Sequence, residues 1–132
     1  MNALMVLLFS CLIGPRTVVV DLSEQSLVLL DYCGNQVGEV LSVSTGAPGW
    51  DTPVGSWTVT AKDDLRDLSS AVAYVEDVPW IIEYDRPFYI HGAYWHDDFG
   101  TPVSHGCVNL SVPDAEWLYA NVDIGDAVIV QW

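Results

Sequence analysis

Residues 104–109 read Ser-His-Gly-Cys-Val-Asn, and residues 90–92 upstream of them read Ile-His-Gly. All three histidines of the chain and one of its three cysteines lie between His91 and Cys107. A cysteine is a strong nucleophile only as its thiolate, so a catalytic cysteine needs a base within hydrogen-bond reach. This clustering is not typical of side-chain packing, and it predicts a cysteine nucleophile served by a histidine.

Three further features complete the predicted chemistry. His91, at the end of an expected strand, can take the thiol proton of Cys107. The backbone carbonyl of Gly92 can then orient the imidazole in place of a carboxylate. Gly106 has no side chain, so the N–H groups of Gly106 and Cys107 can point at a substrate carbonyl as it becomes an oxyanion. Together these groups predict acyl transfer.

Short β-type segments separated by turn signals surround this motif. The expected strands are residues 17–21, 27–31, 37–44, 55–60, 78–83, 87–91 and 122–132, the last with a turn at Gly125-Asp126. Residues 62–71 are polar and Asp-rich, which predicts a surface loop or flap. One helix of two to three turns is expected after Ser111, which can cap it together with Asp114. Many short strands with one short helix predict a mainly β, single-domain sandwich or partly closed barrel.

These segments resemble the L,D-transpeptidase catalytic domain of bacterial cell-wall enzymes, the YkuD family. The family motif is a histidine, then about 14 to 17 residues, then Ser/Thr-His-Gly-Cys, a hydrophobic residue and Asn or Arg. Here His91 lies 16 positions before Cys107, and residues 104–109 match throughout. Further landmarks lie at residues 20–25, 43–46, 52–55 and 78–80. The resemblance covers about residues 17–132, which we expect to form the catalytic domain.

By matching position, the resemblance implies roles for the motif residues. Cys107 resembles the nucleophile, His91 the base that activates it, and Gly92 the orienting carbonyl. Gly106 provides the backbone geometry, and His105 resembles a residue that shapes the site.

Four residues are expected to contact the substrate. Ser104 belongs to the motif, and Asn109 stands where many members have a substrate-binding Arg, so the way the substrate carboxylates are held departs from the family pattern. Tyr94 and Trp95 are expected to line the cleft, although aromatic side chains at strand ends also fill cores or rims.

The resemblance implies a peptidoglycan stem tetrapeptide as substrate and a bacterial cell-envelope location outside the cytoplasm. Cys107 would form a thioester, release D-alanine and pass the acyl group to an amine. If water resolves the thioester instead, the enzyme is an L,D-carboxypeptidase. No cofactor and no stable protein partner are implied, and we expect a monomer.

Two functions from other classes remain open. His91, His96, His105 and Cys107 form an N/S set that a metal-dependent hydrolase could use, although their spacing fits no usual zinc motif, and we expect no metal. A non-catalytic wall-binding module on the same fold is the second alternative, against which the intact His91 and Cys107 argue.

Composition limits the partners further. The 132 residues fit one domain, and 4 Lys+Arg against 18 Asp+Glu give a formal net charge of −14. Four dispersed cations cannot form a phosphate-binding patch, so nucleic acid is excluded, and so is an anionic membrane surface. Most of the acids are expected in solvated turns; the alternative is a protein of saline surroundings, where salt screens their repulsion.

Residues 1–16 form an apolar N-terminal segment, too short to span a bilayer. A targeting or export remnant, a loosely matched lipoprotein box ending at Cys11, and an extra edge strand are the alternatives. Because the nucleophile must be a free thiol, any disulfide would have to join Cys11 to Cys33. We do not expect that pair if Cys11 lies in a removed or membrane-associated segment.

Overall fold

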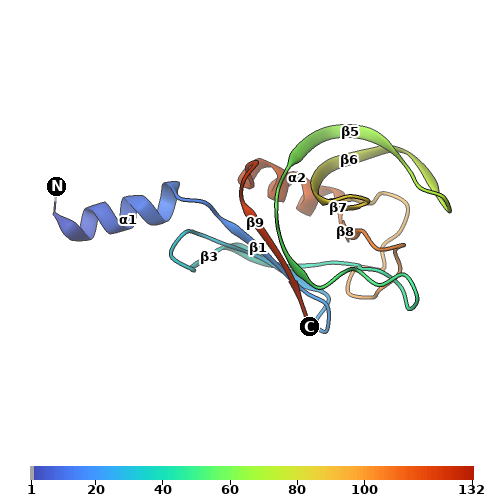
Figure 1. The fold of residues 1–132 in the computed structure, drawn as a ribbon, viewed down its shortest axis with the longest axis horizontal. Helices are drawn as coiled ribbons and strands as arrows, with labels where there is room; N and C mark the ends of the chain where they lie inside the picture. The colour runs from blue at the N-terminus through green and yellow to red at the C-terminus, as the bar shows by residue number, and fades with distance from the viewer. Residues whose placement is uncertain (1) are drawn as a thin grey trace.

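The computed structural model describes residues 2–132, which form two β-sheets and two helices (Figure 1). The larger sheet has the strand order β3-β2-β1-β9-β4, and the smaller sheet has the order β5-β6-β7-β8. The strands are β1 (Thr17–Asp21), β2 (Ser26–Leu30), β3 (Gln36–Ser42), β4 (Gly55–Thr58), β5 (Ala61–Ser69), β6 (Tyr74–Asp85), β7 (Phe88–Gly92), β8 (Val108–Leu110) and β9 (Ala127–Gln131). The prediction of a mainly β sandwich is confirmed.

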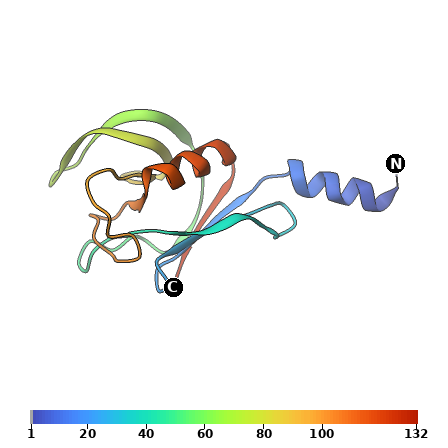
Figure 2. The ribbon, with the colours of Figure 1, turned by 180° about the vertical axis from the view of Figure 1, so that it is seen from behind.

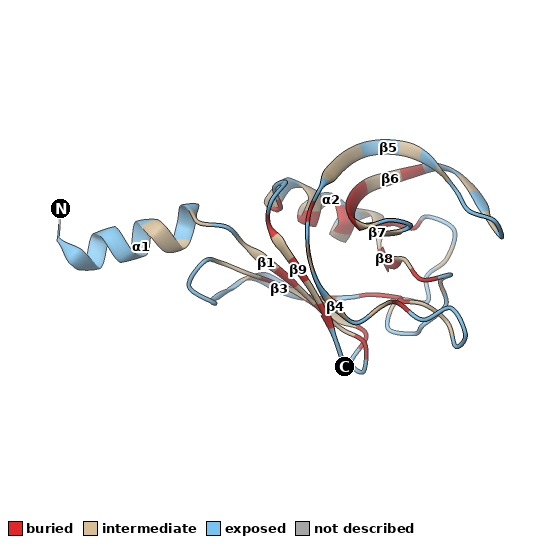
Figure 3. Cartoon of the chain, in the orientation of Figure 1, coloured by how far each residue is buried: buried red, intermediate tan, exposed pale blue. Residues whose placement is uncertain are grey.

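Alternation along the strands builds the core between the sheets. In β1 and β2, every second residue is buried, among them Val18 and Leu29. Val18 pairs with the buried Val128 of β9, to which β1 runs parallel. Ile82 of β6 and Ile90 of β7 enter the same core from the smaller sheet, and Figure 3 shows these buried segments on both sheets. The core therefore holds the two sheets together through β-branched and leucine side chains.

The smaller sheet positions the two motif segments. Strand β8 follows the 104–107 loop and runs parallel to β7, which places His91 opposite Asn109. Helix α2 (Val112–Asn121) packs against β6 and β7. It begins as predicted, because the Ser111 hydroxyl accepts a hydrogen bond from the backbone N–H of Asp114 at 3.3 Å. The two motif segments thus become neighbours only in the sheet.

The expected loop at residues 62–71 is wrong for most of its length. Strand β5 continues to Ser69 and pairs with β6 from Ala61↔Glu83 to Ser69↔Tyr74, with one irregularity after Arg66. An edge strand needs backbone partners on one side only, and its polar side chains stay in solvent, so an Asp-rich composition is compatible with it. The two strands form a curved arm over the molecule (Figure 1).

Helix α1 (Ala3–Ile13) is a second helix, so the expectation of one helix and the edge-strand alternative for the N-terminus are wrong. Its residues are mostly Leu, Met and Ala, which favour helix, and the Asn2 side chain caps it by accepting from Met5 N at 2.9 Å. The helix projects away from the sheets in both views (Figures 1 and 2), and its large apolar side chains are exposed. Met1 lies outside the described residues. Among residues 2–132 no helix is long and apolar enough to span a membrane.

A disulfide joins Cys11 of α1 to Cys33, in the turn between β2 and β3, with the two Cα atoms 5.1 Å apart. Cys107 is a free thiol. The disulfide is thus Cys11–Cys33, the one pairing that leaves the predicted nucleophile Cys107 free. It also links the N-terminal helix covalently to the domain.

Candidate active site

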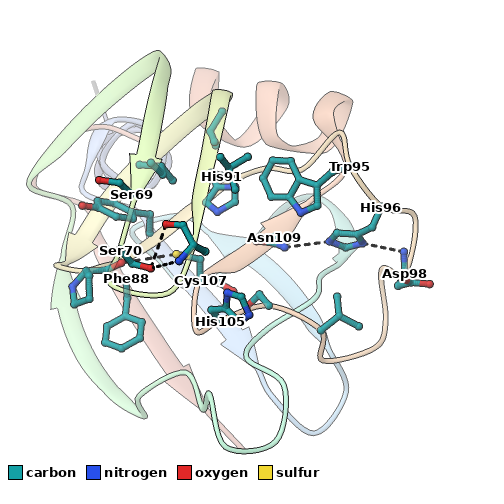
Figure 4. A pocket seen from close by; sticks show the side chains of 18 residues that line it. Ser69, Ser70, Phe88, His91, Trp95, His96, Asp98, His105, Cys107 and Asn109 are labelled. Carbon is teal, nitrogen blue, oxygen red and sulfur yellow. Dashed lines mark hydrogen bonds between the residues drawn. The ribbon is translucent and has the colours of Figure 1, made fainter.

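A cavity of about 370 Å³ opens beside the motif (Figure 4). Its walls come from the β5–β6 hairpin, from β7 and from the segment between Trp95 and Asn109. The hairpin side combines apolar side chains, among them Leu68 and Val75, with the hydroxyls of Ser69 and Ser70. No lysine or arginine of the described chain lines the cavity. The polar groups that a ligand meets there are imidazoles, an amide, hydroxyls, the Cys107 thiol, backbone groups and one carboxylate, that of Asp98.

Cys107 lies on the floor of this cavity, half-buried, at the end of the loop that leads into β8. Its Sγ lies 3.8 Å from the backbone oxygen of Pro87 and forms a weak hydrogen bond with it. Burial raises the pKa of the Cys107 thiol to about 11, partly offset by the backbone N–H of Tyr89. At neutral pH the sulfur is therefore a thiol.

His91 lies in β7, is 4% exposed and lines the same cavity. Its Nδ1 lies 2.9 Å from the carbonyl oxygen of Gly92. A carbonyl can only accept, so Nδ1 carries the proton and Nε2 holds the free lone pair. Burial lowers the pKa of His91 to about 4, with the Gly92 hydrogen bond opposing the shift and the nearby His96 adding to it. The ring is neutral and in the tautomer that a general base requires.

These two pKa directions describe a resting pair of neutral groups. The thiol has a pKa of about 11 and the imidazole a pKa of about 4, so at pH 7 the proton stays on the sulfur. It moves to the imidazole only as the sulfur bonds to a substrate carbon. No hydrogen bond joins Cys107 Sγ to His91 within residues 2–132. The geometry thus favours proton transfer during attack over a preformed thiolate–imidazolium pair.

Hydroxyl groups hold the loop before Cys107. Ser104 Oγ accepts from the N–H of Gly106 at 3.1 Å and donates to the carbonyl oxygen of Cys107 at 2.6 Å. The N–H of Gly106 is therefore occupied, which differs from its expected use toward an oxyanion. Within residues 2–132, the N–H groups of His105 and Cys107 have no hydrogen-bond acceptor.

Gly106 is required at its position for two reasons. Its φ is +120°, a conformation that side-chain-bearing residues rarely adopt. A Cβ placed there would lie 2.5 Å from Cε1 of Phe88, which is too close for real atoms. The ring of His105, which lines the cavity, lies tilted against the ring of Trp50, with centroids 4.6 Å apart.

Of the two aromatic residues expected to line the cleft, only Trp95 lines the cavity. Trp95 lines the cavity and stacks on His91 at a centroid distance of 5.7 Å. Tyr94 does not line this cavity, and its hydroxyl donates to the carbonyl oxygen of Glu76 in β6 at 2.7 Å. Tyr94 therefore ties the loop to the β5–β6 hairpin, whereas Trp95 is placed to meet a ligand.

Asn109 lines the cavity but is engaged by a neighbour (Figure 4). The backbone N–H of Asp98 donates to His96 Nδ1 at 3.0 Å, so the proton of the neutral ring lies on Nε2. Nε2 is 3.1 Å from Asn109 Nδ2, while the buried Oδ1 of Asn109 lacks a partner. Rotating the amide by half a turn gives Nε2–H the acceptor it needs, so the amide oxygen of Asn109 belongs to His96.

Sequence reasoning missed Thr52, Trp50 and Phe88, which brace the loop from outside the motif. Thr52 stood in a family landmark with no role attached to it, and nothing local marked the other two. The candidate metal set is not assembled, because residues 2–132 contain no group of three or more His, Cys, Asp or Glu side chains that could hold an ion.

The sequence profile of the YkuD family, described as the L,D-transpeptidase catalytic domain, matches residues 15–130. The chain belongs to this family. As a member of this family, it has the mainly β fold of the L,D-transpeptidase catalytic domain.

Relatives agree with this assignment. The chain is 43% identical over 104 residues to a protein named probable L,D-transpeptidase 3 of Mycobacterium tuberculosis, covering 70% of this chain and 38% of that protein. It is 30% identical over 142 residues to probable L,D-transpeptidase YbiS of Escherichia coli, covering 89% of this chain and 46% of that protein. The chain thus spans less than half of these curated relatives.

Solved structures show the same fold. A crystal structure of an L,D-transpeptidase from Mycobacterium tuberculosis superposes with a TM-score of 0.82 at 36% identity, covering 90% of this chain and 59% of that one. The structure of L,D-transpeptidase 3 from that organism in complex with a faropenem-derived adduct superposes with a TM-score of 0.78 at 33% identity, covering 90% of this chain and 61% of that one.

Proposed function

We propose that this chain is a cysteine-dependent L,D-transpeptidase domain. Cys107 attacks the carbonyl of the L-centre of a diamino acid, such as meso-diaminopimelate, next to the terminal D-alanine of a stem tetrapeptide. D-Alanine leaves, a thioester forms on Cys107, and an amine acceptor then takes the acyl group.

The observation that carries this proposal is the state of His91 beside Cys107. Both residues line one cavity, and the hydrogen bond from His91 Nδ1 to Gly92 O leaves the Nε2 lone pair free. Burial keeps that ring neutral, so it is ready to accept a proton at physiological pH. A structural thiol or a wall-binding module would have no need of this tautomer.

His91 is proposed to accept and return each proton that moves in the two half-reactions. As the Cys107 sulfur bonds to the carbonyl carbon, its proton moves to His91 Nε2. When the C–N bond to D-alanine breaks, His91 returns the proton to the leaving amine. The acceptor amine then loses a proton to His91 as it attacks the thioester, and the proton returns to the sulfur when the C–S bond breaks.

The oxyanion of each tetrahedral intermediate requires hydrogen-bond donors. The free N–H of Cys107 is the donor nearest the nucleophile, whereas that of Gly106 is held by Ser104. Trp95 is proposed to pack against the stem peptide. Asn109 is proposed to contact the stem peptide through the part of its side-chain amide that is not hydrogen-bonded to His96.

The site of action follows from the proposed substrate. Peptidoglycan lies outside the cytoplasm, and the Cys11–Cys33 disulfide suits an oxidising compartment. We therefore place the protein in the bacterial cell envelope.

Intact-protein mass spectrometry after incubation with a stem tetrapeptide or a carbapenem tests the reaction. We expect one covalent adduct on Cys107, none in Cys107→Ser, and acylation slowed about 100-fold or more in His91→Ala. His96→Ala serves as a matched histidine control and should slow acylation much less. An equal loss in both histidine variants would overturn the assignment of His91 as the base.

Product analysis separates the acceptors. With the tetrapeptide and an amine, a transpeptidase yields the cross-linked product, whereas a carboxypeptidase yields the tripeptide and free D-alanine only. The absence of any adduct or product with the wild-type protein would refute the proposed function.

A further inference from the structure

Thr52 is a buried hydroxyl that lies outside the family motif and touches the loop before the nucleophile. Its Oγ1 accepts from the backbone N–H of Gly46 at 3.0 Å and lies 2.8 Å from the carbonyl oxygen of Gly106. A hydroxyl has one proton, and the Gly46 N–H is itself a donor. The Thr52 proton therefore goes to the Gly106 carbonyl.

This bond sets the direction of the next N–H. In a trans peptide the C=O and the N–H of one peptide unit point in opposite directions. Because Thr52 holds the Gly106 carbonyl on its own side of the loop, the N–H of Cys107 points to the other side. A second hydrogen bond has the same effect on the preceding peptide. The Ala47 N–H donates to the Ser104 carbonyl at 2.8 Å, so the N–H of His105 points away from Ala47.

Thr52 and the candidate active site belong to different cavities. His105 and Cys107 line the cavity of about 370 Å³. Thr52 and Gly46 line a separate cavity of about 180 Å³, and the two cavities share no lining residue. Thr52 is thus separated from any ligand at Cys107 and can act only through the Gly106–Cys107 peptide.

We propose that Thr52 is a positioning residue that aims the N–H of Cys107 at the oxyanion of the substrate. The proposal rests on the proposed function, in which Cys107 forms a tetrahedral intermediate. Ser104 fixes Gly106 N–H and Cys107 O from within the loop, and Thr52 supplies the remaining constraint, on Gly106 O. Preorganised donors of this kind stabilise charge only where their direction is fixed before the reaction.

Three variants test the role. Thr52→Val keeps the shape and removes the hydroxyl, and Thr52→Ser keeps the hydroxyl. Thr45→Val is the matched control, because Thr45 is an equally buried hydroxyl nearby that binds Gln25 Nε2 at 2.7 Å and does not contact Gly106. Melting temperatures and circular dichroism check that each variant is folded, and Thr52→Ala replaces Thr52→Val if that variant cannot be purified.

The readout compares two reactions of the same sulfur. Acylation by a carbapenem develops an oxyanion, whereas alkylation by iodoacetamide displaces iodide and develops none. Loss of an oxyanion donor outright costs about 10²–10³ in rate. We expect Thr52→Val to acylate at least about tenfold more slowly, with alkylation at pH 9 unchanged within about twofold, and Thr52→Ser to restore acylation. Thr45→Val should match the wild type in both reactions.

An equal loss of acylation and alkylation in Thr52→Val, or an equal loss of acylation in Thr45→Val, would show a merely structural role and overturn the proposal. Unchanged acylation in Thr52→Val would do the same. If the wild type itself is not acylated, the proposed function fails separately, and the amide ¹H–¹⁵N shift of Cys107 still tests the orientation. That shift should move in Thr52→Val and stay in Thr52→Ser; an unmoved shift in Thr52→Val refutes the inference.

Discussion

Alkylation of Cys107 should be slow at neutral pH and rise steeply with pH. Burial raises the pKa of this thiol to about 11, so the thiolate fraction at pH 7 is about 10⁻⁴. An unperturbed cysteine with pKa about 8.5 is about 3% thiolate at the same pH. Because the thiolate is the reacting form, iodoacetamide should modify Cys107 about 300-fold more slowly than an exposed cysteine in a peptide.

The pH dependence gives the sharper test. From pH 7 to pH 10 the alkylation rate should increase about tenfold per unit, with no plateau. Acylation by a carbapenem should instead be nearly flat from pH 6 to pH 9, because in the proposed mechanism neutral His91 takes the proton during attack, and the pKa of His91 is about 4. Below pH 4 acylation should fall as His91 is protonated.

Timed intact-protein mass spectrometry measures both rates on one sample. Cys107→Ser is the control for modification elsewhere, since Cys11 and Cys33 are joined in the disulfide. Alkylation that is already rapid and pH-independent at pH 7 would mean a preformed thiolate–imidazolium pair, and the inference of a neutral resting pair would then be wrong.

Three further outcomes concern stability. The pKa of His91 is about 4 in the folded protein against 6.5 for a free histidine, so as pH falls through this window protons bind to the unfolded state first. Stability that is present above pH 6.5 should therefore be lost toward pH 4, by up to about 3 kcal/mol more in the wild type than in His91→Gln, as measured by urea denaturation; equal losses would contradict the burial of the ring. Gly106→Ala should be destabilised by about 1–3 kcal/mol, because of its φ of +120° and the approach to Phe88, and an unchanged urea midpoint would show that the loop relaxes freely. The melting temperature should rise between 0.1 M and 1 M NaCl, where the Debye length falls from about 10 Å to about 3 Å. The formal net charge is −14 and residues 2–132 form only two Arg–carboxylate ion pairs, so salt screens mainly repulsion between acids. A flat or falling melting temperature would show that the acids are already well separated.

Local patterns in the sequence were sufficient for several of the strands and for helix α2. The β-branched residues 17–21 and the apolar residues 27–31 predicted two strands, and these form the antiparallel pair β1 and β2. The cap at Ser111 predicted the start of α2, because a cap depends on residues within one turn. The spacing of His91 and Cys107, together with the contiguous residues 104–109, predicted the family, because this motif is defined along the chain and does not depend on the fold.

The predictions were wrong for two segments whose side-chain composition does not determine their secondary structure. Residues 62–71 were expected to form a loop because of their polar composition, yet backbone pairing with β6 makes most of them a strand. Residues Ala3–Ile13 form a helix and not the edge strand that was one alternative for the N-terminal segment. Nearly all residues of this segment are apolar, so periodicity could not distinguish a helix from a strand.

The sequence by itself determined which residues are present for the chemistry: a cysteine, a histidine with a carbonyl after it, and a glycine that a tight loop needs. Only the tertiary structure decided which of their atoms are free. Ser104 takes up the N–H of Gly106, and Thr52, 54 residues before it, holds the Gly106 carbonyl. Burial favours the thiol form of Cys107 and the neutral form of His91. The bond from Thr52 and the burial of the two catalytic candidates depend on segments that are distant in the chain, so no local pattern can encode them.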